Sequence, residues 1–301
     1  MLDRVQRIEK PLEIQDRMRI SLEPRVLSGN DVLHVEELSK SFPGQTLFSD
    51  ISFDIKRGER VALIGNNGTG KTTMLKIING LIEADAGKFS LGSKVQIGYY
   101  DQEHHVLHMD KTIFQEISGT YPTLTETEIR NMLAAFLFTG DDVFKEISAL
   151  SGGERGRVSL AKLMLSEANF LILDEPTAGL DPKGRDDILD QIAELHKVRG
   201  ITIVLVSHSM EDIAKYVERL IVMNHGKMVF DDTPKNVFSH YKELEGMGLA
   251  APQITYIMHA LSENGLNVDT TATTVEEARD TILEALKKQK PSLLKKGGRN
   301  E

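Results

Sequence analysis

A glycine-rich turn between an apolar run and a helical pattern constrains this chain more than any other feature. Residues 60–65 are RVALIG, and residues 65–73 are GNNGTGKTT, which matches the pattern G-x-x-x-x-G-K-[ST]. The apolar spacing of KTTMLKIINGL, directly after the turn, is typical of a helix. A strand, such a turn and a helix in this order bring backbone N–H groups and a positive helix end together, where they bind phosphate oxygens. The motif therefore predicts a P-loop.

The residues of this loop have different expected roles. The glycines at 65, 68 and 70 allow the backbone to curl so that its N–H groups face inward. Lys71 is expected to reach the terminal phosphates, and Thr72 to offer its hydroxyl to Mg²⁺. The residues expected to contact the nucleotide here are Gly65, Asn66, Asn67, Gly68, Thr69, Gly70, Lys71, Thr72 and Thr73.

A second apolar run ends on two adjacent acids. The run FLILDE, residues 170–175, predicts a buried strand with Asp174 and Glu175 at its tip. Two adjacent carboxylates repel one another. A bound cation, or a reaction that uses them, would account for their position. In a P-loop protein the acid at the end of such a strand holds Mg²⁺, which we expect of Asp174. Glu175 points elsewhere and is expected to orient or polarise a water molecule for attack on the γ-phosphate.

Strand and helix patterns alternate along most of the chain. Examples are the strand pattern ITIVLVSH and the helix pattern DDILDQIAELHKV before it. This alternation predicts a mostly parallel sheet with helices on both faces. The runs RLIVMN and KMVFDD, joined by His-Gly, predict a hairpin at the edge of the sheet. Thr125 and Glu128 form an expected capping box at the start of a helix.

Composition limits the class of protein. The chain has 301 residues, a net charge of −9 and no cysteine. The acidic balance disfavours diffuse binding to nucleic acid, so no direct DNA binding is expected. Without cysteine there is neither a disulfide nor a cysteine metal site, which fits a reducing cytosol. No apolar run approaches the ~20 residues of a membrane span.

A second glycine motif begins another predicted helix. Residues 150–165 are LSGGERGRVSLAKLML, with Ser-Gly-Gly at the start of the helix. The backbone N–H groups of such a start form another anion-binding end. One nucleotide hardly needs two phosphate-binding helix ends from a single domain, so the second end requires a separate explanation.

Taken in order, these motifs resemble those of the ATP-binding cassette (ABC) ATPases over about residues 32–245. The resemblance assigns the Walker A loop to Gly65–Thr72, the signature motif to Leu150–Glu154 and the Walker B strand to Phe170–Asp174, followed by Glu175. It implies an Mg²⁺-dependent ATPase that dimerises around ATP. In that family the signature motif of one cassette covers the ATP held by the P-loop of another, so a second cassette, identical or different, is an expected partner.

The resemblance also assigns residues outside these three motifs. Gln102 belongs to the Q-loop, where its amide oxygen ligates Mg²⁺ and senses the γ-phosphate. Asp181 belongs to the D-loop, and His208 is the switch histidine that contacts the γ-phosphate or the attacking water. Phe42 is the candidate for stacking on adenine, with core packing as the rival role and Phe48 as a substitute.

The expected site residues fall into three groups. The residues expected to act in hydrolysis are Lys71, Gln102, Glu175 and His208. The residues expected to ligate Mg²⁺ are Thr72, Gln102 and Asp174. The residues expected to bind nucleotide outside the P-loop are Phe42, Ser151, Gly152, Gly153 and Asp181.

The resemblance differs between the two parts of the chain. Residues 1–175 resemble the second cassette of an ABC-F protein, a soluble class whose members often act on the ribosome. Residues 176–290 resemble the ATP-binding subunit of an energy-coupling-factor importer, through runs such as AGLDPKGR and DDTPKNVFS. The chain therefore resembles a mosaic of the two.

The expected fold is an α/β P-loop NTPase with a mostly parallel sheet, an antiparallel β edge, a helical signature subdomain and a small C-terminal helical region. Residues 1–31 are expected to be the end of a linker helix, and residues 32–245 the nucleotide-binding domain. The helical subdomain is expected at about residues 103–165, and a helical region with a basic tail at residues 246–301.

Three functions are consistent with these motifs. The first is the ATP-hydrolysing subunit of a membrane importer, located in the cytoplasm at the inner face of the membrane and bound to a membrane-embedded subunit. The second is a soluble ABC-F-type factor, or a fragment of one, that binds the ribosome. The third is a competent ATPase without a surviving partner.

Overall fold

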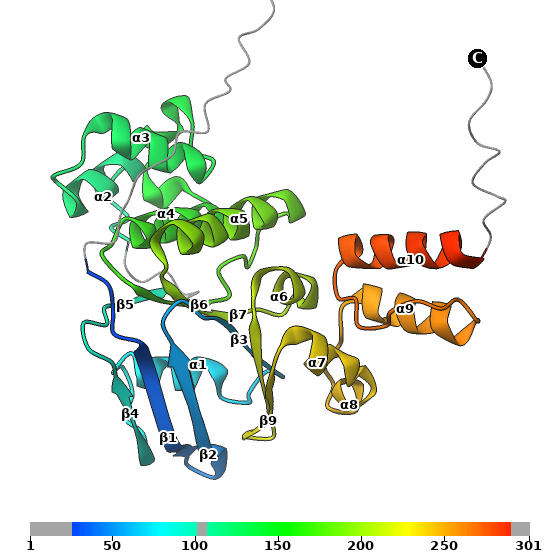
Figure 1. Ribbon diagram of the computed structural model, residues 1–301. Helices are drawn as coiled ribbons and strands as arrows, with labels where there is room; N and C mark the ends of the chain where they lie inside the picture. The colour runs from blue at the N-terminus through cyan, green and yellow to red at the C-terminus, as the bar shows by residue number, and fades with distance from the viewer. Residues whose placement is uncertain (1–25, 101–106, 290–301) are drawn as a thin grey trace, which may run out of the picture.

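The computed structural model describes residues 26–100 and 107–289 (Figure 1). Within them the chain builds two β-sheets, a group of helices above the larger sheet and a pair of helices beside it. Gln102, most of the expected linker and the end of the basic tail lie outside the described residues.

A six-stranded sheet in the order β5-β6-β7-β3-β8-β9 forms the centre of the molecule. Its first five strands are parallel, and β9 pairs with β8 in the antiparallel sense. The strands are β3 (Arg60–Gly65), β5 (Ile97–Tyr100), β6 (Phe170–Asp174), β7 (Thr202–Val206), β8 (Arg219–Asn224) and β9 (Lys227–Asp232). The prediction of an α/β fold with a mostly parallel sheet and an antiparallel edge is confirmed.

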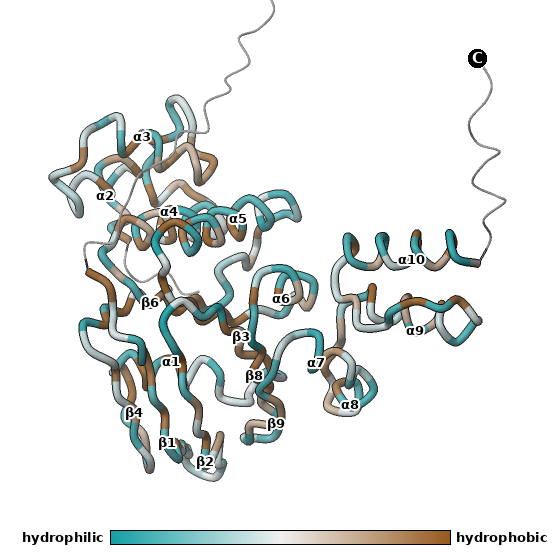
Figure 2. Tube along the Cα trace, viewed as in Figure 1, coloured by the Kyte–Doolittle hydropathy of each residue, from teal (hydrophilic) through white to brown (hydrophobic). Residues whose placement is uncertain are grey.

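Both faces of this sheet are buried. Successive residues of a strand point to opposite faces, and in β6 the side chains of Phe170 and Ile172 join one apolar cluster while Leu171 and Leu173 join another. This explains why the central strands are continuous apolar runs rather than alternating ones. Figure 2 shows these apolar residues concentrated along β6, β3 and β8.

A smaller antiparallel sheet lies beside the first (Figure 1). Its order is β2-β1-β4, with β1 (Asp31–Phe42), β2 (Gln45–Lys56) and β4 (Ala86–Leu91). One apolar cluster joins this sheet, helix α1 (Lys71–Ile78) and one face of the larger sheet. The cluster fixes the loop before α1 against β2, which matters for the site described below.

The helices on the other face include the predicted helical subdomain. They are α2 (Ile113–Thr120), α3 (Glu126–Ala135), the short 3₁₀ helices η1 (Gly140–Phe144) and η2 (Ile147–Ala149), α4 (Gly152–Met164), α5 (Pro182–Arg199) and α6 (Met210–Tyr216). The side chain of Thr125 accepts the backbone N–H of Glu128, whose carboxylate accepts the backbone N–H of Thr125, so the predicted capping box is present.

Up to residue 289, where the described part of the chain ends, four helices follow β9. They are α7 (Pro234–Ser239), α8 (Tyr241–Gly246), α9 (Gln253–Glu263) and α10 (Val275–Gln289). Helices α9 and α10 stand to one side of the sheets in Figure 1 and share a small apolar cluster around Met258 and Ala278. The large cluster ends at Leu249 and Ala251. The domain limits expected from the sequence stay a prediction.

None of the helices within residues 26–100 and 107–289 combines the length and the apolar character that a membrane span requires.

Candidate nucleotide site

The predicted P-loop joins β3 to α1. Gly68 and Gly70 have φ angles of 81° and 94°, which residues with a side chain rarely adopt. A Cβ atom on Gly70 would lie 2.5 Å from Cδ1 of Phe48, because the loop packs directly against β2. Backbone conformation and close packing therefore both require glycine at position 70.

The side chain of Lys71 is held inside this loop. Its Nζ lies 2.7 Å from the carbonyl oxygen of Gly65 and 3.0 Å from that of Asn66, and the residue is only 7% exposed. Burial lowers the pKa of Lys71, although the nearby carboxylates of Glu175 and Asp174 oppose this shift. The ammonium group thus lies beside the space where the sequence predicts that phosphate binds.

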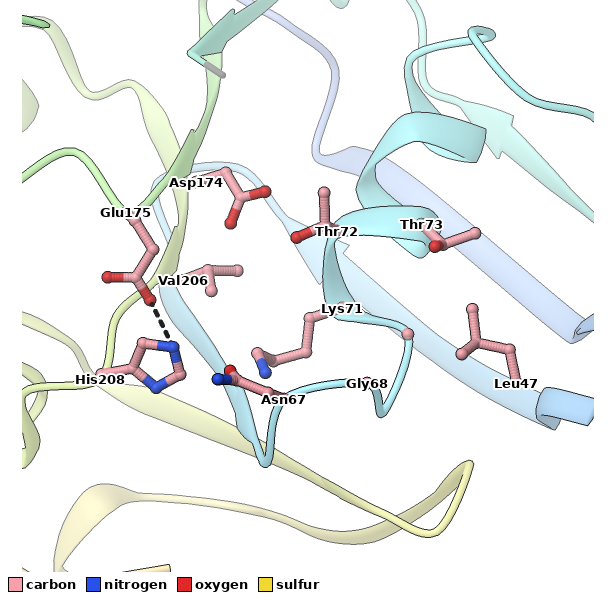
Figure 3. Close-up of a pocket in the computed structure, with 11 residues that line it drawn as sticks. Leu47, Asn67, Gly68, Lys71, Thr72, Thr73, Asp174, Glu175, Val206 and His208 are labelled. Atoms are coloured by element: carbon pink, nitrogen blue, oxygen red, sulfur yellow. Dashed lines mark ion pairs between the residues drawn. The ribbon is translucent and has the colours of Figure 1, made fainter. Parts of the chain in front are cut away.

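A cavity of about 230 Å³ opens in front of the loop (Figure 3). It lies between the P-loop and the carboxyl ends of β6 and β7, the edge of a parallel sheet where ligands of α/β proteins bind. The predicted site residues that line it are Asn67, Gly68, Gly70, Lys71, Thr72, Thr73, Asp174, Glu175 and His208. Leu47 and Val206 also line it; no motif marked them, because their role depends only on packing.

The two acids at the tip of β6 differ in environment. Asp174 is 4% exposed and, in Figure 3, its carboxylate points toward the hydroxyl of Thr72. Glu175 has a φ of 51°, a left-handed backbone conformation that turns its side chain away from that of Asp174. Burial and the charge of Asp174 raise the pKa of Glu175 to about 7, against the opposing effect of Lys71. A carboxylate with this pKa can exchange a proton near neutral pH.

Glu175 and His208 lie next to each other in the lining of the cavity. Glu175 Oε1 lies 3.4 Å from His208 Nε2, and the histidine side chain is 58% exposed (Figure 3). Within the described part of the chain, this buried carboxylate oxygen accepts no hydrogen bond. The oxygen is therefore available to a water molecule or a ligand in the cavity.

The oxygen atoms at the cavity fit Mg²⁺. Thr72 and Asp174 supply a hydroxyl and a carboxylate, the hard donors that this ion prefers. Among residues 26–100 and 107–289 no group of three or more histidine, aspartate or glutamate side chains could hold a metal ion by itself. A site with few protein donors suits Mg²⁺, which retains waters and takes further ligands from substrate phosphates.

The signature motif is not at this cavity. Ser151 caps α4 by accepting the backbone N–H of Glu154 at 3.3 Å, and Gly152 is exposed beside it. Asp181 caps α5 by accepting the backbone N–H of Gly184 at 3.1 Å. The cavity lining includes none of Ser151, Gly152, Gly153 and Asp181. Within a single chain, the signature motif therefore does not contact the predicted nucleotide site.

Four other predicted residues lie away from the cavity lining: Phe42, Gly65, Asn66 and Thr69. Phe42 is 48% exposed at the end of β1, so it is not a core residue. Phe48 is fully buried and cannot replace it as a stacking partner. The side chain of Asn66 donates to the carbonyl oxygen of Met247 instead of facing the cavity.

Comparison with known proteins gives consistent results. The ABC transporter family matches residues 48–178. The chain is similar to the energy-coupling factor transporter ATP-binding protein EcfA2 of Clostridium tetani, at 38% identity over 83% of this chain and 96% of that protein. It is also similar to the putative ATP-binding protein YdiF of Bacillus subtilis, at 41% identity over 74% of this chain and 34% of that protein. Among solved structures it resembles CbiO1 of Clostridium perfringens, described as part of the ABC transporter complex CbiONQ, with a TM-score of 0.60 and 28% identity over 78% of this chain and 100% of that chain.

These comparisons do not support the resemblance of residues 1–175 to an ABC-F cassette. The alignment to EcfA2 of Clostridium tetani spans 276 residues, so the likeness is not confined to residues 176–290. A second EcfA2, of Clostridium perfringens, aligns over 280 residues. The division of the chain near residue 175 and the ribosome as a partner are therefore without support.

Proposed function

Because this chain belongs to the family of ABC transporter ATPases, we propose that it is the ATP-hydrolysing subunit that energises a membrane importer of the energy-coupling-factor type. The chain covers 96% of a relative named as an energy-coupling factor transporter ATP-binding protein, and this is the observation that carries the importer assignment. The cavity between the P-loop and the tips of β6 and β7 supports ATP as the substrate.

The residues at the cavity have different roles in hydrolysis. The backbone N–H groups of the P-loop and the ammonium of Lys71 bind the phosphates. The carboxylate of Glu175 orients a water molecule and accepts its proton, and His208 holds the γ-phosphate or that water from the other side. Mg²⁺, when bound, neutralises phosphate charge, and Thr72 and Asp174 would hold it, with Gln102 as a further predicted ligand.

A second cassette is part of this proposal. The cavity contains no residue of the signature motif, whose start at Ser151 is exposed on the same chain. The positive end of α4 is therefore free to meet the ATP held by another cassette. Either a second copy of this chain or a different cassette fits this role.

A membrane-embedded subunit is the other proposed partner, and it places the chain at the cytoplasmic face of the membrane. The helical subdomain that follows residue 102 is where an importer ATPase receives such a subunit. Met109, Leu137 and Phe144 are each exposed by more than 40% in this region. Exposed apolar side chains of this kind support docking to another protein.

The proposal is tested by purifying the Glu175→Gln variant from detergent-solubilised membranes of the native host with ATP. We expect a membrane-spanning protein and a second cassette to co-purify in stoichiometric amounts. The same variant without ATP is the control for nucleotide-dependent assembly. Recovery of an active ATPase with no membrane protein at all would contradict the importer assignment while leaving the ATPase intact.

A further inference from the structure

The side chain of Asn66 turns away from the cavity to which its loop belongs. Asn66 follows Gly65 directly, and its Nδ2 lies 2.6 Å from the carbonyl oxygen of Met247, 181 positions further along the chain. The next residue, Asn67, lines the cavity, whereas Asn66 does not. The second residue of the P-loop is thus bound to the end of α8.

The end of α8 is built so that it can accept this bond. The backbone N–H of Leu249 donates to Leu244 at 2.8 Å, and that of Gly248 donates to Glu245 at 2.9 Å. With Gly248 at a φ of 78°, these are the two bonds of a Schellman motif. The helix supplies no donor for the carbonyl of its cap residue, Met247. Asn66 satisfies that carbonyl.

The backbone of Asn66 is tied to the phosphate-binding part of the loop. Its carbonyl oxygen accepts the hydroxyl of Thr69 at 2.9 Å and the ammonium of Lys71 at 3.0 Å. Asn66 therefore contacts the end of α8 through its side chain and Lys71 through its backbone carbonyl. A change in the position of Asn66 would be transmitted to the lysine that reaches the phosphates.

The segment after α8, residues 247–253, also contacts helix α6. The backbone N–H of Gln253 lies 3.3 Å from the carboxylate of Glu211. Glu211 is in the first turn of α6, three residues after His208. Leu249 and Ala251, within the segment, are buried in the large apolar cluster. The segment that leads into α9 is thus bound both to the P-loop, at Asn66, and to α6, the helix that follows His208.

From these contacts we propose that Asn66 is a positioning residue, which holds the P-loop in its phosphate-binding shape through the end of α8. The inference rests on the proposed binding of ATP at this cavity. A loop held in its bound shape loses less conformational freedom when ATP binds, so affinity rises. Because coupling between sites is reciprocal, ATP in turn stabilises residues 247–253 and their connection to α9.

Two substitutions at Asn66 test this role in the full-length chain. Asn66→Ala removes the donor, and we expect the dissociation constant for Mg-ATP, measured by calorimetry, to rise about three- to tenfold. Asn66→Asp places a carboxylate oxygen against the Met247 carbonyl and should raise the dissociation constant for Mg-ATP at least as much. In steady-state assays KM should rise while kcat stays close to that of the parent chain.

A substitution on the other side of the contact supplies a second test. A Cβ atom on Gly248 would lie 3.2 Å from Asn66 Nδ2, so Gly248→Ala should weaken ATP binding by displacing Asn66. In the Asn66→Ala background the same change should have little further effect, since the contact is already lost. Gly265→Ala is the matched control, because Gly265 also has a left-handed φ, of 87°, but its added Cβ meets no atom within 4 Å.

The change in hydrogen exchange on adding Mg-ATP, compared within each variant, reports on the contact at Asn66 separately from the stability of the whole fold. Mg-ATP should slow amide exchange in residues 247–253 of the parent chain, and much less in Asn66→Ala. Failure of the parent chain to bind ATP would overturn the proposed function. Normal ATP binding by the parent chain, with the same affinity and the same protection of residues 247–253 in Asn66→Ala, would overturn only the role of Asn66.

Discussion

Glu175 and His208 reach the same cavity from neighbouring parallel strands, with 3.4 Å between Oε1 of the glutamate and Nε2 of the histidine. Asp174, the last residue of β6, is paired with Val206, the last residue of β7. The carboxyl ends of the two strands are therefore level, and the residues just after them face each other. This register places a buried carboxylate and an exposed imidazole next to each other in the lining of one cavity.

Glu175→Gln should bind Mg-ATP but hydrolyse it at least about 100-fold more slowly. The amide has the shape of the carboxylate but cannot accept a proton from water. Binding is measured by calorimetry and turnover by phosphate release. ATP should also trap a closed dimer that elutes early in size-exclusion chromatography. Hydrolysis at the parent rate would show that Glu175 does not position the water.

Lys71→Ala should raise the dissociation constant for ATP about 10- to 100-fold, the range typical of a lost hydrogen bond to a charged group. Lys71 is the only lysine that lines the cavity within the described ranges 26–100 and 107–289. Lys76→Ala is the control, since Lys76 lies on the same helix but not at the cavity. Equal affinity in the Lys71 and Lys76 variants would remove Lys71 from the phosphate site.

Ser151→Arg should leave ATP binding to the single chain unchanged and abolish turnover. Ser151 is exposed at the start of α4 and away from the cavity, so an arginine there would obstruct only the face that meets a second cassette. Ser148→Arg, a change at another exposed serine three residues earlier, is the matched control. Normal turnover of the Ser151 variant would argue against a composite site.

Phe42→Ala should weaken ATP binding by on the order of 1–3 kcal/mol, the usual value of one base on one aromatic ring. Phe42 is half-exposed, so its loss should leave the free energy of unfolding almost unchanged. Phe48→Ala provides the contrast: that ring is fully buried, and its removal should lower the free energy of unfolding by about 3–5 kcal/mol. Calorimetry and urea unfolding separate the two effects. Unaltered ATP affinity in the Phe42 variant would exclude stacking.

Glu116→Gln should lower the free energy of unfolding by about 2 kcal/mol at pH 7, because it replaces the buried carboxylate of an ion pair with Lys162 by a neutral amide. Glu116 is fully buried on α2, with Lys162 Nζ at 2.5 Å and His108 Nδ1 at 2.9 Å. Burial raises the pKa of Glu116, but these two bonds more than offset it, so the pKa lies below the ordinary 4.5.

The same pKa shift predicts how this stabilisation depends on pH. A carboxyl group with a lowered pKa in the folded state stabilises the fold above its unfolded pKa, and the contribution is lost as pH falls through the folded value. The stability difference between the parent chain and Glu116→Gln should therefore be full at pH 7 and shrink below about pH 4.5. Glu126→Gln, a change at an exposed carboxylate on α3, should alter stability little at either pH.

Several parts of the structure could be predicted because their signals are local. The P-loop conformation depends on glycines at fixed positions between one strand and the next helix. The hairpin of β8 and β9 depends on His225 and Gly226, which adopt φ angles of 46° and 73° as a tight turn requires. In these cases the residues that adopt the conformation are the same residues whose types predict it from the sequence.

Other parts depended on residues far apart in the chain. The sequence marks Glu175 as an acid at a strand end, but its pKa of about 7 depends on burial and on the charge of Asp174, which only the folded sheet establishes. Leu47 carries no motif, yet it lines the cavity because β2 packs beside the P-loop.

The sequence by itself determined the phosphate-binding loop, the acids at the end of β6 and the alternation of strands and helices, since backbone geometry and burial periodicity are properties of short segments. Only the tertiary structure decided which residues meet at the cavity and that the side chain of Asn66 binds the Met247 carbonyl outside the cavity lining. Such contacts depend on strand order and packing across the whole chain, which no short segment specifies.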